Sequence, residues 1–111
     1  MGGGKISKVM LVASVGDALE VVLDGGAVWD ERQRLFRMST TDESVKVPRT
    51  NQLQVVGYVR GYDDNRLLLS ASRCAGFDID GRVTMPFLYY VHADVIQSAF
   101  DYTRSALIEF E

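Results

Sequence analysis

The chain has 111 residues, of which 47% are hydrophobic and 24% charged, and its formal net charge is −3 at pH 7. This length suffices for one domain with one hydrophobic core and is too short for two. The negative charge argues against a protein whose whole surface neutralises phosphates, so any nucleic-acid binding is expected from a local patch or through a partner.

The other totals exclude several classes of protein. No apolar run approaches the roughly 18 residues of a membrane span, so a soluble, intracellular protein is expected. The single cysteine, Cys74, cannot form an internal disulfide, and no set of Cys and His has the spacing of metal ligands, so no cofactor is expected. The first four residues, MGGG, are interpreted as a flexible lead-in or tag remnant.

The first half of the remaining chain is predicted to form three strands. Residues 5–15 are rich in β-branched residues and predict a first strand, and Gly16 and Asp17 predict a turn into a second strand that ends at residues 24–26, Asp-Gly-Gly. After a crossover, residues 34–39 alternate as a short third strand. Residues 40–51 are polar and contain Pro48, so they are interpreted as a connector.

Residues 53–61 and 66–74 are predicted to form a hairpin around a polar turn at residues 63–65. Period two separates a core face from an outer face of the first of these strands, and Gly57 in its interior predicts a bend or bulge. The outer face combines aromatic and basic side chains, which can stack on bases and attract phosphate. The candidate nucleic-acid-binding residues are Tyr58, Arg60, Tyr62 and Arg66.

The period changes after Thr84, which is a plausible N-cap, and a helix is expected from about Met85 to about Ile108. Its apolar residues cover an arc of roughly 180°, whereas a helix on one core needs roughly 100°. The surplus predicts either a helix that is shared with a partner or one that wraps deeply into its own domain. The candidate partner-interface residues are Leu88, Val91, Val95, Ile96, Ala99, Phe100, Thr103 and Leu107.

The residues that could carry catalysis do not form a persuasive site, and no enzyme is predicted. His92 falls within the apolar arc of the expected helix and is interpreted as a core or interface histidine. The carboxylate pairs Asp63-Asp64 and Asp78-x-Asp80 lie in turn sequences, where Asp bonds the backbone. No glycine-rich stretch has the sequence of a phosphate-binding loop.

Five strands and a terminal helix predict a five-stranded OB-fold, an all-β barrel at residues 5–83 followed by a C-terminal helix at residues 84–111. The order of KVMLVASV, LEVVLDGG, RLFRMS, VVGYV and the Pro-Phe pair at residues 86–87 resembles the smallest subunit of replication protein A, and also a related telomere-capping subunit. This resemblance covers about residues 5–102.

The resemblance implies a non-enzymatic accessory subunit of a nuclear single-stranded-DNA-binding complex, acting in DNA replication, repair or telomere maintenance. Its C-terminal helix would join a helix bundle with other OB-fold subunits, and single-stranded DNA would be bound mainly by the complex. No membrane and no small-molecule substrate are implied.

Two alternatives remain open. One is a stand-alone single-stranded nucleic-acid-binding OB module. The other is an Sm-like RNA-binding ring subunit, because GYVRGYDDNRLLL at residues 57–69 resembles the Gly-x-Val-x-Gly-Tyr-Asp run of that family. Two expectations count against the Sm-like alternative: no helix is predicted before the first strand, and a long helix is predicted after the last.

Overall fold

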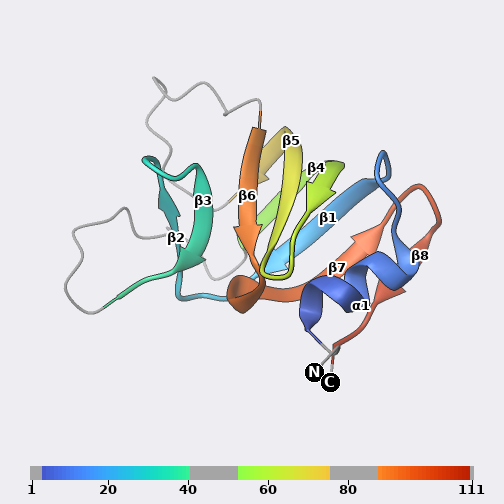
Figure 1. Cartoon of the computed structure of the whole chain (residues 1–111), viewed down its shortest axis with the longest axis horizontal. Helices are drawn as coiled ribbons and strands as arrows, with labels where there is room; N and C mark the ends of the chain where they lie inside the picture. Colours follow the sequence, from blue (N-terminus) through green and yellow to red (C-terminus); the bar gives the residue numbers. More distant parts are fainter. Residues whose placement is uncertain (1–3, 41–52, 76–87, 111) are drawn as a thin grey trace.

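The computed structural model describes residues 4–40, 53–75 and 88–110. In these ranges the chain forms an eight-stranded mixed sheet and one short α-helix (Figure 1). The elements are α1 (Lys5–Val12), β1 (Ala18–Leu23), β2 (Ala27–Asp30), β3 (Leu35–Met38), β4 (Leu53–Tyr62), β5 (Arg66–Ala75), β6 (Leu88–His92), the 3-10 turn η1 (Ala93–Val95), β7 (Ile96–Asp101) and β8 (Ala106–Ile108).

The strands lie in the order β2-β3-β6-β5-β4-β1-β7-β8. All neighbouring strands are antiparallel except β3 and β6, which are parallel. The sheet therefore has a central antiparallel unit, β6-β5-β4-β1-β7, with the β2–β3 hairpin added at one side and β8 at the other (Figure 1). The predicted five-stranded OB barrel is wrong, because the sheet has eight strands and does not close on itself.

Residues 5–12 form helix α1, where a strand was predicted. Ile6, Val9 and Ala13 are buried at helical spacing, and α1 packs on β7 and β8. The Lys5 ammonium donates to the carbonyl of Ile96 at 2.7 Å. The β-branched residues of this segment favour a strand by propensity, but burial of one helical face on the sheet outweighs that preference.

The predicted C-terminal helix is also wrong. Residues 88–101 form β6, η1 and β7, and β8 follows. Tyr89 and Val91 are buried and alternate with more exposed residues along β6, which is the strand period. An apolar arc of about 180° contains half of all positions on a helical wheel, and two strands that each bury every second residue produce the same fraction. The apolar arc calculated for a helix was therefore too wide because these residues alternate with the period of strands.

The predicted hairpin is present as β4 and β5, and its register shifts next to Gly57, as predicted. A Cβ atom at Gly57 would collide with the carbonyl oxygen of Ser70 and would lie 3.2 Å from the hydroxyl of Tyr89. Gly57 therefore allows two strands and a buried tyrosine to approach closely. Gly16 has a φ of 101° and makes the turn between α1 and β1.

An aromatic cluster attaches the β2–β3 hairpin to the central unit. The ring of Phe36 lies 4.7 Å from that of Trp29 and 5.4 Å, edge-on, from that of Tyr89. Phe36 and Tyr89 are almost fully buried, so the hairpin contributes to the core. In the parallel ladder, Phe36 is opposite Val91 on β6.

Candidate functional site

A cleft of about 380 Å³ opens where the β4–β5 turn, the end of β6 and the β2–β3 hairpin meet. It falls within the size range of small-ligand sites. Its lining residues are Gln33, Leu35, Asp63, Asp64, Asn65, Arg66 and His92. The cleft therefore brings together residues that are nearly 60 positions apart in the sequence.

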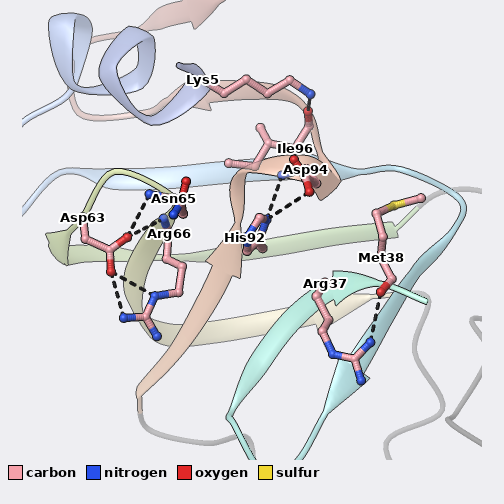
Figure 2. Close-up of polar contacts among 9 residues, drawn as sticks. All are labelled: Lys5, Arg37, Met38, Asp63, Asn65, Arg66, His92, Asp94 and Ile96. Carbon is pink, nitrogen blue, oxygen red and sulfur yellow. Dashed lines mark hydrogen bonds and ion pairs between the residues drawn. The ribbon is translucent and has the colours of Figure 1, made fainter. Parts of the chain in front are cut away.

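Asp63 organises the turn that forms one wall of the cleft. Its Oδ1 accepts the backbone N–H groups of Asn65 at 2.9 Å and of Arg66 at 2.8 Å (Figure 2). The backbone N–H of Asp63 donates to the carbonyl of Arg66 at 2.9 Å. The sequence predicted that Asp63 bonds the backbone of a turn, and this geometry agrees with that prediction.

The guanidinium group of Arg66, at the start of β5, is held in one orientation by two neighbouring side chains. Its Nε and Nη2 donate to Oδ2 of Asp63 at 2.9 and 2.8 Å, and its guanidinium carbon lies 4.1 Å from the ring centroid of Tyr90. The hydrogen bonds from Arg66, together with the backbone bonds of the turn, lower the pKa of Asp63. The guanidinium is thus fixed between a carboxylate and an aromatic face, which preorganises it to contact a planar group.

His92 faces Arg66 across the β5–β6 ladder. Its Nδ1 accepts the backbone N–H of Asp94 at 3.1 Å and so caps η1 (Figure 2). An accepting Nδ1 places the proton of a neutral imidazole on Nε2. Residues 88–92 form a strand, so the placement of His92 on the apolar face of a helix is wrong. The side chain of His92 is 31% exposed.

The backbone of η1 is tied to the turn, because the N–H of Ala93 donates to the carbonyl of Asn65 at 2.7 Å. Asn65, Arg66 and His92 line the cleft together with Leu35, so its lining combines an amide, a guanidinium and an imidazole with an apolar side chain. Such a mixture of donors, acceptors and planar surfaces fits the edges and faces of a heterocyclic base.

The charge around the cleft is mixed. Arg66 is paired with Asp63, and Asp64 is an exposed carboxylate. On the neighbouring β2–β3 turn, Arg32 and Arg34 are exposed on either side of Gln33. These two arginines can contact phosphates, whereas the cleft itself is suited to base contacts.

The four candidate nucleic-acid-binding residues do not lie at one site. Arg66 lines the cleft, while Tyr58, Arg60 and Tyr62 are exposed along the outer face of β4. The Nε of Arg60 donates to the hydroxyl of Ser70 at 3.1 Å. Sequence reasoning missed Gln33, Asn65 and His92; the polar turn at residues 63–65 was visible, but His92 could be found only by recognising β6 as a strand.

The eight candidate partner-interface residues do not form one surface. Val91, Val95, Ile96 and Ala99 are buried in the core of this chain, at 1% exposure or less. Leu88 and Leu107 are 41% and 59% exposed, Thr103 is exposed and Phe100 is half-buried. The apolar surface attributed to a shared helix is thus largely used within the same sheet.

Among the residues that the structure describes, no group of three or more His, Cys, Asp or Glu side chains could hold a metal ion. Asp78 and Asp80 lie outside the described residues. Within residues 4–40, 53–75 and 88–110, no helix has the length and hydropathy needed to cross a membrane. Comparison with protein-family models, curated proteins and solved structures finds no match.

Proposed function

We propose that this chain is an Sm-like module that binds single-stranded RNA in the cleft. The observation that carries the proposal is the placement of Arg66 opposite His92, with Asn65 at the adjoining turn. Single-stranded RNA presents unstacked bases. Their edges can form hydrogen bonds with amide and imidazole groups, and their faces can stack on a guanidinium group.

The order of the elements supports the Sm-like alternative. Both sequence expectations that counted against it are reversed, because α1 precedes β1 and the described residues after β6 contain no α-helix. The run GYVRGYDDNRLLL, which resembles the Sm-like family, lies in β4, β5 and the turn that lines the cleft. The resemblance and the cleft therefore point to the same part of the molecule.

A role in a replication protein A-like complex stays a prediction, but it has lost the feature on which it was based. The expected helix at residues 84–111 was to carry the assembly, and residues 88–110 form strands and one 3-10 turn instead. We therefore favour direct RNA binding over helix-mediated assembly.

The module is proposed to act as a monomer rather than as a ring. The outer edge of β6 pairs with β3, and the outer edge of β7 pairs with β8. Among the strands that the structure describes, the two edges of the sheet are β2 and β8, of four and three residues. Short edge strands are a common way to prevent strand addition by neighbouring molecules. Light scattering tests this point: a mass of six or seven copies would contradict the monomer.

Fluorescence anisotropy with a labelled single-stranded RNA of mixed sequence, at low and moderate salt, tests RNA binding. We expect His92→Ala and Asn65→Ala each to weaken binding about tenfold, because each removes one contact worth about 1 kcal/mol or slightly more. Gln97→Ala, an exposed substitution on β7, is the control and should not change the affinity. Equal affinities for all three variants and the unmodified chain would refute the cleft as the site.

The same experiment with DNA of the matching sequence compares the rival functions. The Sm-like proposal predicts stronger binding to RNA. Stronger binding to DNA that is reduced by Tyr58→Ala and Tyr62→Ala, and unchanged by His92→Ala, would favour the stand-alone module acting through β4.

A further inference from the structure

A second surface lies on the outer face of β4, β1, β7 and β8, away from the cleft-lining residues. Along one row across the sheet, Glu20 on β1 is flanked by Val56 on β4 and Phe100 on β7, and Phe100 is next to Leu107 on β8. In the next row, Ala18 is opposite Tyr58 and its carbonyl accepts the N–H of Tyr102 at 2.9 Å. The aromatic–glutamate face, as we call it, consists of Glu20, Tyr58, Phe100, Tyr102 and Leu107.

The face is accessible and apolar for a sheet surface. Tyr58, Tyr102 and Leu107 are 48%, 51% and 59% exposed. Ala18 lies between Tyr58 and Tyr102 and has only a methyl side chain, so it leaves space between the two aromatic side chains. Contiguous exposed aromatic surface of this kind is typical of interaction sites.

Glu20 places a negative charge among these rings. The hydroxyl of Tyr102 donates to Oε2 of Glu20 at 3.2 Å, and the ring of Tyr102 meets that of Phe100 edge-on at 4.9 Å. A carboxylate beside exposed aromatic faces attracts a cation in two ways, by Coulomb attraction and by the quadrupole of the rings.

We infer that the aromatic–glutamate face binds a basic segment of a partner protein, with an arginine or lysine side chain placed over Ala18 against Glu20. Charge complementarity favours a basic occupant next to Glu20, because the carboxylate repels the phosphates of a nucleic acid and attracts a guanidinium or ammonium group. The neighbouring positive charge, Arg60, is bonded to the hydroxyl of Ser70, which lies on the side of Tyr58 away from Ala18. Tyr58 and Tyr102 are the aromatic anchors, and Leu107 contributes apolar area at the edge of the face.

The test uses the full chain and a labelled peptide of alternating glycine and arginine, with a glycine–glutamine peptide as its neutral counterpart. We expect the basic peptide to bind and the neutral one to bind at least about tenfold more weakly, by anisotropy at low salt. Glu20→Gln should weaken binding of the basic peptide about tenfold. Glu31→Gln makes the same chemical change at an exposed position of the β2–β3 turn, and it should leave the affinity unchanged.

Two further measurements make the result specific. Tyr58→Ala should weaken peptide binding while leaving RNA binding at the cleft unchanged, since Tyr58 does not line the cleft. Thermal unfolding of each variant verifies that it is folded. Equal losses for Glu20→Gln and Glu31→Gln would show attraction by net charge alone, and equal affinity for the two peptides would show that charge does not drive binding. Either result would overturn the proposal, as would the absence of peptide binding.

Discussion

The guanidinium of Arg66 is stacked on the ring of Tyr90, with its central carbon 4.1 Å from the ring centroid, and this contact joins β5 to β6 beside the cleft. The edge of the same guanidinium donates two hydrogen bonds to Asp63, so Tyr90 contacts its face and Asp63 contacts its edge. The orientation of Arg66 is therefore determined before any ligand arrives.

The first prediction follows from this stack. Tyr90→Leu removes the aromatic face and should lower the free energy of unfolding by about 0.5–1 kcal/mol, the usual range of an exposed cation–π contact. It should also weaken RNA binding about fivefold, because Arg66 is then less well oriented. Urea unfolding and anisotropy measure the two effects. Tyr90→Phe retains the ring and is the matched control; a loss as large as that of Tyr90→Leu would contradict the stacking argument.

A second prediction concerns the close approach at Gly57. Gly57→Ala should destabilise the protein by about 1–3 kcal/mol, because its Cβ would overlap the carbonyl of Ser70 and the strands would have to separate. Gly61→Ala, on the same strand, is the control, since the nearest atom to its Cβ would be Cδ2 of Leu68 at 4.0 Å. Thermal and urea unfolding compare the two. Equal stability of both variants would show that β4 and β5 are less tightly packed than described.

A pair of neighbouring carboxyl groups gives a third prediction, on pH dependence. Asp101 is fully buried, and burial followed by its interaction with the carboxyl of Asp17 raises the pKa of Asp101. The same interaction, together with hydrogen bonds from Ser14 and Arg104, lowers the pKa of Asp17. The folded protein therefore retains a proton on Asp101 at pH values at which the unfolded chain has lost it.

A raised folded-state pKa contributes stability that is fully present below the ordinary pKa of an aspartate and is lost as the pH rises through the raised value. Asp101→Asn cannot ionise, so its free energy of unfolding relative to the unmodified protein should increase from acidic to neutral pH. Urea unfolding across that range measures the difference. Asp64→Asn, at an exposed position of the turn between β4 and β5, is the control and should show no such trend. A constant difference for Asp101→Asn would contradict the shared proton.

The fourth prediction concerns the hairpin that covers β6. Phe36→Ala removes a buried ring that contacts Trp29 and Tyr89, and it should destabilise the protein by about 3–5 kcal/mol. A loosened β2–β3 hairpin uncovers the outer edge of β6, so self-association should appear in light scattering at concentrations where the unmodified chain is monomeric. Met38→Ala, at an exposed position of the same strand, should do neither. A destabilised but monomeric Phe36→Ala variant would show that β3 does not protect the edge.

The sequence predicted the β4–β5 hairpin well because its information is local. Alternating apolar residues, Gly57 and the polar turn at residues 63–65 all lie within one short segment, and the register shift next to Gly57 lies in the same segment. The outward direction of Tyr58 and Tyr62 was likewise readable from period two, and both side chains are exposed.

The two helix–strand errors have one physical cause: each segment is compatible with both periods over a short window, and only long-range packing decides between them. Residues 5–12 become a helix because β7 and β8 offer a surface for Ile6 and Val9. Residues 88–101 become strands because β5 and β1 offer free edges. The position of His92 in the site depends on the second of these pairings, so the site could not be assembled from the sequence.

The anchoring of α1 by residues near the other end of the sequence has a consequence for biosynthesis. Lys5 bonds the carbonyl of Ile96, and the buried face of α1 rests on strands that the ribosome produces last among the described elements. Contacts of such large sequence separation form late, because closing the intervening chain costs entropy before any burial compensates for it. During translation, Ile6 and Val9 therefore remain uncovered until β7 and β8 emerge, and this nascent segment is where we expect chaperones to bind.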